Sequence, residues 1–389
     1  MKFKKRNKSI IYVNFPPYDN AGKILDFLKT KYRYIFHFSF NFHRLEGTSN
    51  SSTFTIIKNN RIIHRTSLFQ ILPPPQLIYF FIPIRSLIFL IQIIWYGNRL
   101  KKVYGKIDDY FTVNAYTAWC GLALKKLGFV QRTIFWVWDY YPPIDQSNVV
   151  MFMRWLYWHF DKLATKSDKV IFLNSKLLSL RKSINSITDK KKYPVVGIGT
   201  TVHKIKHARS KISLLFIGVL KRSQGLDLLI DNSKNIKNYY PDIEVHIIGS
   251  GPDEKYFKSK AQRSAIPLRF HGLMDVYSKK AQNIITITNI GIAMYKPEPG
   301  NVSYFGDPSK IKNYLSFGLP VITTDVFEFA KEIRENKAGL VIPYEINPFI
   351  RSLKKIFSQY KEFSTRSIKL AEKHNYKVMY ETIFSEDKQ

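Results

Sequence analysis

Short apolar runs alternate with amphipathic runs of helical period along most of the chain. In the first half, helix-type runs at 21–32, 115–128 and 175–184 separate the runs of strand type. This alternation is typical of parallel sheets that are covered on both faces by helices. The strand-type runs are SIIYVNF (9–15), YRYIFHFSF (32–40), DDYFTVN (108–114), RTIFWVW (132–138) and KVIFLNS (169–175).

The second half repeats the alternation with strand-type runs that are almost wholly apolar, as in parallel strands buried on both faces. The pattern restarts after a basic stretch, so we place a domain boundary near Val196–Arg209 and predict two doubly wound α/β domains. Ser175 is expected to cap the helix that it begins, and a last helix is expected over about 364–385. The runs are ISLLFIG (212–218), IEVHIIG (243–249), LRFHG (268–272), IGIAMY (290–295), PVITTD (320–325) and AGLVIP (338–343).

One segment, LIYFFIPIRSLIFLIQIIWY (77–96), is apolar over nearly the length of a membrane-spanning helix. Arg85, Gln92 and Arg99 recur at every seventh position, which places them on one stripe of a helix. Three interpretations are open. The helix lies in the core, it lies in the membrane interface with its basic flank at 99–102 toward anionic headgroups, or it spans the membrane, which a central Arg makes costly by about 2.5–3.5 kcal/mol.

The composition excludes several classes of protein. A chain of 389 residues with 45% hydrophobic and 15% aromatic residues is not disordered, and it is long enough for two domains. The single cysteine, Cys120, excludes an intramolecular disulfide and a multi-cysteine metal site. The apolar run after the basic N-terminus is too short for a signal peptide, so we expect Ser9–Phe15 to be the first strand of a cytoplasmic domain.

The formal net charge of +32 calls for an anionic partner, or it reflects a composition biased toward Lys on solvated surfaces. An anionic membrane surface and a phosphate-bearing small substrate both fit this charge. No nucleic-acid partner is expected, because the sequence contains none of the usual nucleic-acid-binding motifs.

Three predicted strands of the second half end in glycines, which are Gly218, Gly249 with Gly251, and Gly272. Ligands bind at the carboxyl ends of the strands of a doubly wound sheet, and glycines there let backbone N–H groups approach a phosphate. Lys221, Arg222 and Gly225 follow the first of these turns, where cations would neutralise a diphosphate.

A fourth element, GDPSKIKNYLSFGLPVITTD (306–325), predicts a helix that starts near the same edge of the sheet. Asp307 or Ser309 is expected to cap this helix. Lys310 lies in the first turn, where a cation opposes the helix dipole, and a bound diphosphate would explain it.

These segments resemble the retaining GT-B glycosyltransferases of the GT4 type, the glycosyltransferase group 1 family. The resemblance rests on LLFIGVLKRSQGLDLLI (214–230), VHIIGSGP (245–252), FHG (270–272) and PSKIKNYLSFGLPVITTD (308–325), and more loosely on FPPYDNAG (15–22), FWVWDYYPP (135–143) and KVIFLNSKLLSLR (169–181). It implies two Rossmann-like domains facing a central cleft. The domains expected are an acceptor-binding domain over 1–198, with a membrane-contacting helix at 77–100, a nucleotide-sugar-binding domain over 199–369, and a C-terminal helix over 370–389 that packs back on the first domain.

The resemblance also implies the roles of the candidate residues. The donor is a nucleotide-diphosphate sugar, with no metal and no separate cofactor. Asp139 and Glu298 are the catalytic candidates, and Gly22, Trp138 and Tyr141 lie on the acceptor side. The donor-binding candidates are Gly218, Lys221, Arg222, Gly225, Gly249, Gly251, His271, Gly272, Ser309, Lys310 and Asn313.

The chain departs from the family pattern at several of these positions. Val219 stands where the family has an Arg, and Gln224 stands where it has a Lys. Of the two family glutamates, the first falls at Phe305, for which Glu298 is a candidate substitute, and the second falls at Asn313. Trp138 stands in place of a His that is common near the acceptor site.

We therefore expect a hexosyltransferase that moves a sugar with retained configuration to a lipid-linked or nascent cell-surface glycan. It is expected in the cytoplasm, peripherally on the inner face of the cell membrane. Two alternatives stay open. One is a sugar-nucleotide epimerase of GT-B fold, and the other is a non-catalytic subunit that binds a nucleotide sugar.

Overall fold

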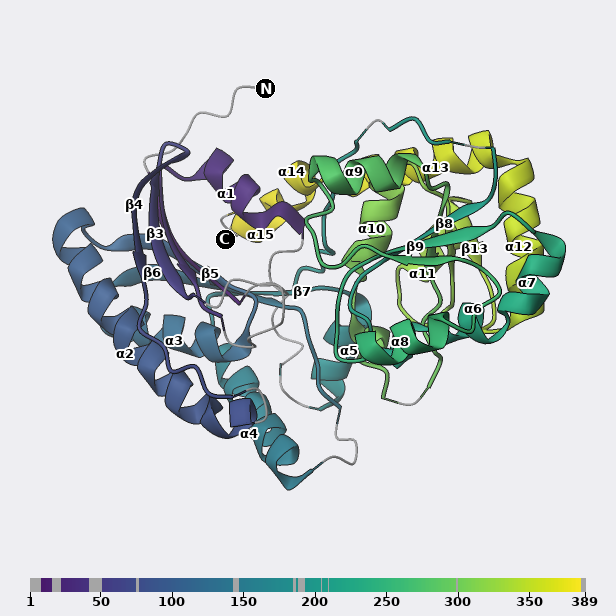
Figure 1. Cartoon of the computed structure of the whole chain (residues 1–389). Coiled ribbons are helices and arrows are strands. Elements are labelled where there is room, and N and C mark those ends of the chain that lie inside the picture. Colours follow the sequence, from purple (N-terminus) through teal and green to yellow (C-terminus); the bar gives the residue numbers. More distant parts are fainter. Residues whose placement is uncertain are drawn as a thin grey trace. The chain divides into compact units, whose positions relative to one another are not determined.

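The computed structural model describes residues 8–15, 22–41, 51–74, 77–142, 147–184, 187, 193–203, 205–208, 210–298 and 300–385. The chain forms two compact units, and each contains one sheet (Figure 1). Unit 1 comprises residues 1–197 and 376–389, and unit 2 comprises residues 198–375. The predicted fold class, α/β with two Rossmann-like domains, is confirmed.

The sheet of unit 1 has the strand order β4-β3-β2-β1-β5-β6-β7. The five strands from β2 to β7 in this order are parallel, whereas β3 pairs antiparallel with both β2 and β4. The sequence pattern did not predict the β3–β4 hairpin, whose turn residues Asn59 and Asn60 both have positive φ. The strands are β1 (Ser9–Asn14), β2 (Tyr34–Ser39), β3 (Thr53–Lys58), β4 (Arg61–Ser67), β5 (Ile107–Thr112), β6 (Val130–Val137) and β7 (Lys169–Phe172).

Seven helices of the described part of the chain belong to unit 1. The cap of α5 differs from the predicted one, since Asn174 rather than Ser175 accepts a hydrogen bond from the backbone N–H of Leu177, at 2.9 Å. The predicted C-terminal helix over 364–385 is wrong as one element, because it breaks into three. The helices are α1 (Ile24–Lys31), α2 (Ile78–Tyr104), α3 (Ala115–Lys126), α4 (Asn148–Ala164), α5 (Ser175–Ser183), α14 (Tyr376–Met379) and α15 (Glu381–Phe384).

Helix α2 contains the apolar segment and is buried along one stripe only. Arg85 belongs to the buried stripe, together with Phe89 and Ile93, and its guanidinium donates to the backbone oxygen of Asn41 at 2.6 Å. Gln92 bonds the backbone N–H and C=O of Phe69, both at 2.9 Å. By length and composition alone, Phe80–Tyr104 could cross a membrane. Because only one stripe of α2 is buried, the helix is not enclosed in the core.

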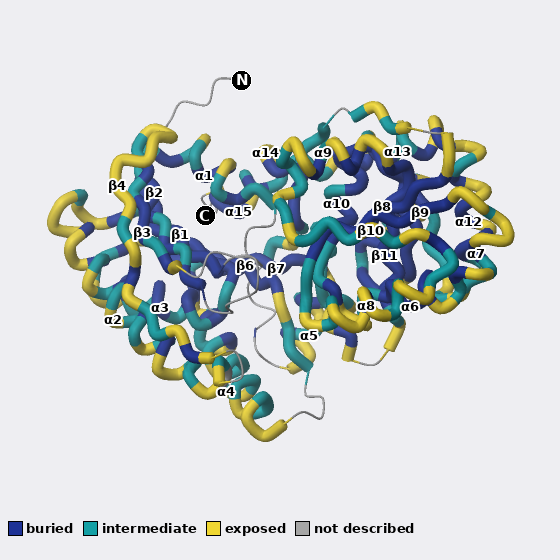
Figure 2. Tube along the Cα trace, in the orientation of Figure 1, coloured by how far each residue is buried: buried dark blue, intermediate teal, exposed yellow. Residues whose placement is uncertain are grey.

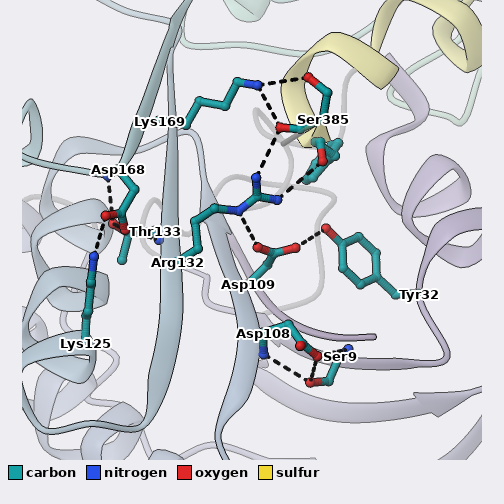
Figure 3. A network of polar contacts seen from close by, with 11 residues as sticks. Ser9, Tyr32, Asp108, Asp109, Lys125, Arg132, Thr133, Asp168, Lys169 and Ser385 are labelled. Atoms are coloured by element: carbon teal, nitrogen blue, oxygen red, sulfur yellow. Dashed lines mark hydrogen bonds and ion pairs between the residues drawn. The ribbon is translucent and has the colours of Figure 1, made fainter. Parts of the chain in front are cut away.

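The C-terminal segment packs on unit 1 at the edge where its parallel strands begin (Figure 3). Arg132 donates to Asp109 at 2.7 Å and to the backbone oxygen of Ser385 at 3.1 Å. Lys169 donates to the same Ser385 oxygen at 2.9 Å, and Tyr32 donates to Asp109 at 2.5 Å. Burial and the Asp109 carboxylate raise the pKa of Tyr32, so the phenol stays a donor.

The sheet of unit 2 is wholly parallel and has the order β10-β9-β8-β11-β12-β13. Its strands are β8 (Ser213–Ile217), β9 (Glu244–Ile248), β10 (Leu268–Phe270), β11 (Ile290–Ala293), β12 (Val321–Thr323) and β13 (Gly339–Val341). Its α-helices are α6 (Asp227–Asp231), α7 (Ser233–Tyr239), α8 (Glu254–Ala261), α9 (Lys279–Thr286), α10 (Ser309–Ser316), α11 (Ala330–Glu335), α12 (Ile346–Ser358) and α13 (Tyr360–Lys373).

Helix α10 begins at Ser309 with Pro308 at the cap position, so the predicted cap by Asp307 or Ser309 is wrong. The Asp307 carboxylate instead accepts a hydrogen bond from the backbone N–H of Ile198, at 2.7 Å. Its other oxygen lies 3.6 Å from the buried ammonium group of Lys312. Asp307 thus ties the start of α10 to the segment by which the chain enters unit 2.

Replacement of Phe384 by alanine should destabilise unit 1 by about 3–5 kcal/mol, the usual cost of emptying a buried phenylalanine site. Phe384 is 3% exposed, and its ring contacts those of Phe27 and Phe111 at centroid distances of 5.4 and 4.9 Å. Urea unfolding measures the loss. Val378→Ala, at a side chain that is 72% exposed on α14, is the control and should change stability by less than about 0.5 kcal/mol. Equal effects of the two variants would contradict the packing of α15.

Candidate functional site

The three glycine-ended strands of unit 2 are neighbours, and their ends are bonded to one another. The backbone N–H of Gly249 donates to the oxygen of Gly272 at 2.9 Å, and that of Gly218 donates to the oxygen of Ile248 at 3.0 Å. A β-carbon on Gly249 would lie 1.9 Å from the oxygen of Gly218, and one on Gly251 would lie 2.6 Å from backbone atoms of Leu220. Only glycine permits this approach, so the sequence-predicted glycines do converge at one edge of the sheet.

Lys310 lies beneath the first of these turns. A β-carbon built on Gly218 would lie 3.4 Å from the Lys310 ammonium nitrogen. That nitrogen donates to Oε1 of Gln224 at 2.7 Å, and it lies 4.5 and 4.7 Å from the ring centroids of Phe216 and Tyr295. These four contacts join α10 to the ends of β8 and β11 and to the loop after β8.

The Lys310 ammonium is buried among neutral groups, since the side chain is 7% exposed and its contacts are an amide and two aromatic rings. Burial lowers the pKa of Lys310 from 10.5 to about 7. A buried cation without an anion is costly, and an anion placed beside it would remove that cost. The arrangement is therefore suited to receive negative charge.

The remaining charged candidates of this loop lie on its outer side. Lys221 and Arg222 are exposed, and the Arg222 guanidinium lies 5.0 Å from the ring centroid of Tyr256 and 3.9 Å from Asp227. Gly225, with φ of 77°, packs against the backbone of Met294, where a β-carbon would clash at 1.5 Å. The structure thus separates Arg222 from the groups that contact Lys310.

Glu298 is exposed in the loop that follows β11. This loop is held against the glycine turn after β8, since the N–H of Lys296 donates to the oxygen of Ser223 at 3.1 Å. Asn301 donates from its side chain to the Lys296 oxygen at 2.8 Å, which fixes the loop from its other end. Glu298 is therefore carried by a loop adjoining the glycine turns.

Ser309 and Asn313 lie on α10 with Lys310, and both are half-buried. The Asn313 side-chain oxygen accepts from the hydroxyl of Tyr277 at 3.0 Å. The backbone after β8 is fixed by Tyr314, whose hydroxyl accepts from Ile217 at 2.6 Å and donates to Ile292 at 3.1 Å.

His271 lies next to Gly272, directly after β10, and forms a row of polar side chains with His246 and Glu244 of β9. Its Nε2 lies 3.0 Å from Nδ1 of His246, and Nε2 of His246 lies 3.3 Å from the Glu244 carboxylate. Burial lowers the pKa of both histidines, so they are neutral near pH 7. His246 then directs its Nε2–H toward Glu244 and accepts from His271, which leaves Nδ1 of His271 as an acceptor.

The acceptor-side candidates lie on unit 1. The buried indole of Trp138 has no partner for its N–H within the part of the chain that the structure describes, and it meets Trp136 edge-on at 5.2 Å. Asp139 is exposed, and Tyr141 meets Tyr157 edge-on at 4.8 Å. Gly22 accepts a hydrogen bond from Tyr380 at 2.7 Å. Residues 16–21 and Pro143, which belong to the same predicted motifs, lie outside the described residues.

A buried ion pair fixes the backbone at Asp139. Arg181 of α5 donates to the carboxylate of Asp161 in α4 at 2.9 Å and to the backbone oxygen of Asp139 at 3.1 Å. Burial raises the pKa of Asp161 to about 6, while Arg181 acts in the opposite direction. The end of β6 is thus held by two helices of the same unit.

Sequence reasoning did not assign Gln224, Tyr295 and His246 to the site. Gln224 stood out only as a departure at a family position, and no local pattern places its amide on Lys310, 86 residues away. His246 reaches His271 because β9 and β10 are paired in register, which the sequence alone does not give.

Residues 200–374, which lie within unit 2, match the model of the family described as glycosyl transferases group 1. No curated protein matches the chain. Within the described residues, no group of three His, Cys, Asp or Glu side chains could hold a metal ion.

Several solved structures share the fold over most of the chain. Trehalose-6-phosphate synthase OtsA is 13% identical with a TM-score of 0.66, covering 96% of this chain and 98% of its own. Sucrose-phosphate synthase from Thermosynechococcus elongatus is 15% identical with a TM-score of 0.63, covering 97% and 96%. S. aureus TarM, in complex with fondaparinux, alpha-GlcNAc-glycerol and UDP, is 13% identical with a TM-score of 0.56, covering 87% and 75%.

The family match covers the glycine turns, Lys310 and the whole sheet of unit 2, and the structural matches extend over both units. Unit 2 is thus similar to the glycosyl transferases group 1 family over nearly its whole length, and the chain is a transferase enzyme with the fold of the GT-B glycosyltransferases.

Proposed function

We propose that the enzyme moves a sugar from a nucleotide-diphosphate sugar to a hydroxyl group of a lipid-linked or nascent cell-surface glycan, with the anomeric configuration retained. The observation that carries this proposal is the Lys310 ammonium, which lies buried beneath the Gly218 turn in contact with neutral groups of the described part of the chain. A diphosphate is the anion that a glycine-lined edge of a parallel sheet accepts.

The groups of unit 2 supply what the leaving diphosphate requires. Negative charge grows on the leaving oxygen as the glycosidic bond to the donor breaks, and donors held in place beforehand stabilise it without reorganisation. Lys310 is the candidate for this donor, since the N–H groups of Gly218 and Gly249 are already bonded to the backbone oxygens of Ile248 and Gly272. Asn313 is suited to the ribose hydroxyl groups, since its amide both donates and accepts. Glu298 is the candidate for contact with the donor sugar.

The acceptor hydroxyl is assigned to the end of β6. The exposed carboxylate of Asp139 is the group that can take the proton of this hydroxyl. No side chain is assigned as a covalent nucleophile, so retention is attributed to attack on the face from which the diphosphate leaves. The UDP bound in the TarM structure is consistent with such a donor.

A second candidate function is a non-catalytic subunit that binds a nucleotide sugar. Asn313 in place of a family glutamate, with its oxygen already bonded to Tyr277, favours this alternative. An epimerase is the other alternative within the fold.

Incubation of the purified chain with a panel of nucleotide sugars separates these functions. Slow hydrolysis of one donor, or transfer from it, is the expected result, followed as release of nucleoside diphosphate. Conversion of the donor to its epimer would instead identify an epimerase. Binding without turnover of any donor would identify a subunit without activity.

The affinity for UDP should fall as the pH rises above 7. The free Lys310 ammonium has a pKa of about 7, and a bound diphosphate favours its charged form, so binding takes up a proton above that pH. The dissociation constant is expected to rise by up to about tenfold per pH unit. Calorimetry between about pH 6.5 and about pH 9, a range that spans this pKa, measures the dissociation constant.

Lys310→Arg should flatten this profile, because arginine stays charged. Lys310→Met should weaken binding by about tenfold to a hundredfold at pH 6.5 or so, the loss of one charge-assisted contact. Lys237→Met, at an exposed lysine of α7, is the matched control and should leave the profile unchanged. A pH slope that survives in Lys310→Arg would assign the titration to another group.

We further propose that the enzyme lies peripherally on the inner face of the cell membrane, with the basic end of α2 toward anionic headgroups. Co-sedimentation with phosphatidylglycerol-containing liposomes should be lost when Arg99, Lys101 and Lys102, all exposed, are replaced together by glutamate. The same liposomes at high salt serve as a control, since screening should weaken binding of the unaltered chain. Binding that resists both treatments would refute this electrostatic contact.

A further inference from the structure

The first three turns of α4 are apolar, yet they are not buried. Residues 149–160 read VVMFMRWLYWHF, and none of them is buried, whereas Asp161 and Ala164 at the end of the helix are (Figure 2). A helix of a globular protein normally buries such a sequence. Something outside the described part of this chain is therefore expected to cover it.

One side of α4 holds the segment that carries the acceptor-side residues. Arg154 donates to the backbone oxygen of Pro142 at 2.6 Å. Tyr157 donates to the oxygen of Asp139 at 3.1 Å, and Trp158 donates to that of Tyr141 at 3.0 Å. Three side chains of α4 thus bond three carbonyl groups of residues 139–142, so a shift of α4 would shift this segment too.

The opposite side of α4, which we name the α4 outer face, consists of Val149, Phe152, Trp155 and His159. Phe152 is 53% exposed and Trp155 is 56% exposed, and their rings stack at 6.0 Å. No acidic residue occurs in 148–160, and the exposed Lys162 and Lys166 follow at the C-terminal end.

Helix α2, which packs against α4, carries a second exposed apolar stripe. It contacts α4, and Tyr116 of α3 links the two by donating to Ser86 of α2 at 2.6 Å and meeting Phe160 of α4 edge-on at 5.0 Å. The exposed stripe of α2 is formed by Phe80, Ile84, Leu87, Ile91 and Trp95. Like the first part of α4, this helix has no acidic residue, and it ends in Arg99, Lys101 and Lys102.

We infer that the α4 outer face, together with the exposed stripe of α2, docks on an anionic phospholipid surface and holds residues 139–142 at that surface. The inference rests on the proposed function in one respect, that the acceptor is lipid-linked. Charge complementarity supports the occupant, because both helices lack acidic residues along their apolar faces and carry exposed lysines or arginines at their ends. Tryptophan and phenylalanine side chains on such a face are typical of helices in the membrane interface.

The consequence for the reaction follows from the bonds between α4 and residues 139–142. A lipid-linked acceptor presents its hydroxyl groups just outside the headgroups, whereas a soluble acceptor does not require any particular height above the membrane. By binding the membrane with one side and residues 139–142 with the other, α4 sets Asp139 and Trp138 at the level of such an acceptor. The apolar α4 sequence then has a role that core packing does not explain.

The test uses the full chain with Phe152 and Trp155 both replaced by glutamate. The control is Tyr239→Glu with Ile287→Glu, which places the same charges on exposed side chains of unit 2. With vesicles of phosphatidylcholine and phosphatidylglycerol, the control should co-sediment like the unaltered chain, and Phe152→Glu/Trp155→Glu should lose at least about tenfold in affinity, since two aromatic side chains no longer leave water.

A second measurement identifies the residue that meets the lipid. Vesicles with brominated acyl chains should quench part of the tryptophan fluorescence, and Trp155→Phe should remove part of that quenching, whereas Trp119→Phe should not. Unchanged quenching in Trp155→Phe, or equal vesicle binding by both double variants, would overturn the inference. A dimer that only Phe152→Glu/Trp155→Glu dissociates, seen by light scattering, would also overturn it, because the α4 outer face would then be a subunit interface.

These measurements need no donor turnover, so they stand if the proposed function fails. If a donor is hydrolysed, its hydrolysis without vesicles should be equal in the unaltered chain and in Phe152→Glu/Trp155→Glu. Equal loss of hydrolysis and vesicle binding in that variant would indicate unfolding, which circular dichroism detects. The quenching measurement on Trp155→Phe then decides by itself whether the α4 outer face meets the lipid.

Discussion

The contact between a buried ammonium group and a backbone turn governs the chemistry of unit 2. Lys310 projects from the first turn of α10 to the underside of Gly218, and its nitrogen is satisfied by one amide oxygen and two ring faces. Neutral partners hold the lysine in place, and burial lowers its pKa to about 7. An anion bound beside it would therefore favour its charged form.

The same contact bears on one departure from the family pattern, the glutamine at position 224. Gln224 lies where the family has a lysine, and its oxygen is 2.7 Å from the Lys310 nitrogen. A second ammonium group at that distance would repel the first, whereas the amide of Gln224 accepts a hydrogen bond from it. On this chain α10 supplies the cation and the loop after β8 supplies the amide that orients it. The Arg222 guanidinium lies over the ring of Tyr256.

The sequence was most informative where one local rule decides the outcome. Alternating apolar and amphipathic runs predicted the parallel strands of both sheets, and glycines at the ends of adjacent strands predicted their convergence, since carboxyl ends of parallel strands share an edge. Features that depend on tertiary competition were not predicted. Asn174 displaced Ser175 as a cap, and Asp307 was drawn from its cap position to Ile198. The Asn59-Asn60 pair is a local signal for a hairpin turn, since both residues have positive φ. It was not used, because the surrounding sequence was interpreted as alternating strands and helices. Of the predicted stripe of Arg85, Gln92 and Arg99, only Arg85 is buried, and its guanidinium donates to the carbonyl oxygen of Asn41.

The return of the chain to unit 1 after residue 375 has a consequence for synthesis. Unit 2 is continuous from 198 to 375, so it can fold as a complete domain once these residues have emerged from the ribosome. Unit 1 begins first but is closed only when Tyr380 and Phe384 reach the rings of Phe27 and Phe111. During translation the earlier half must wait, with part of its apolar surface uncovered, until the later half has already been made.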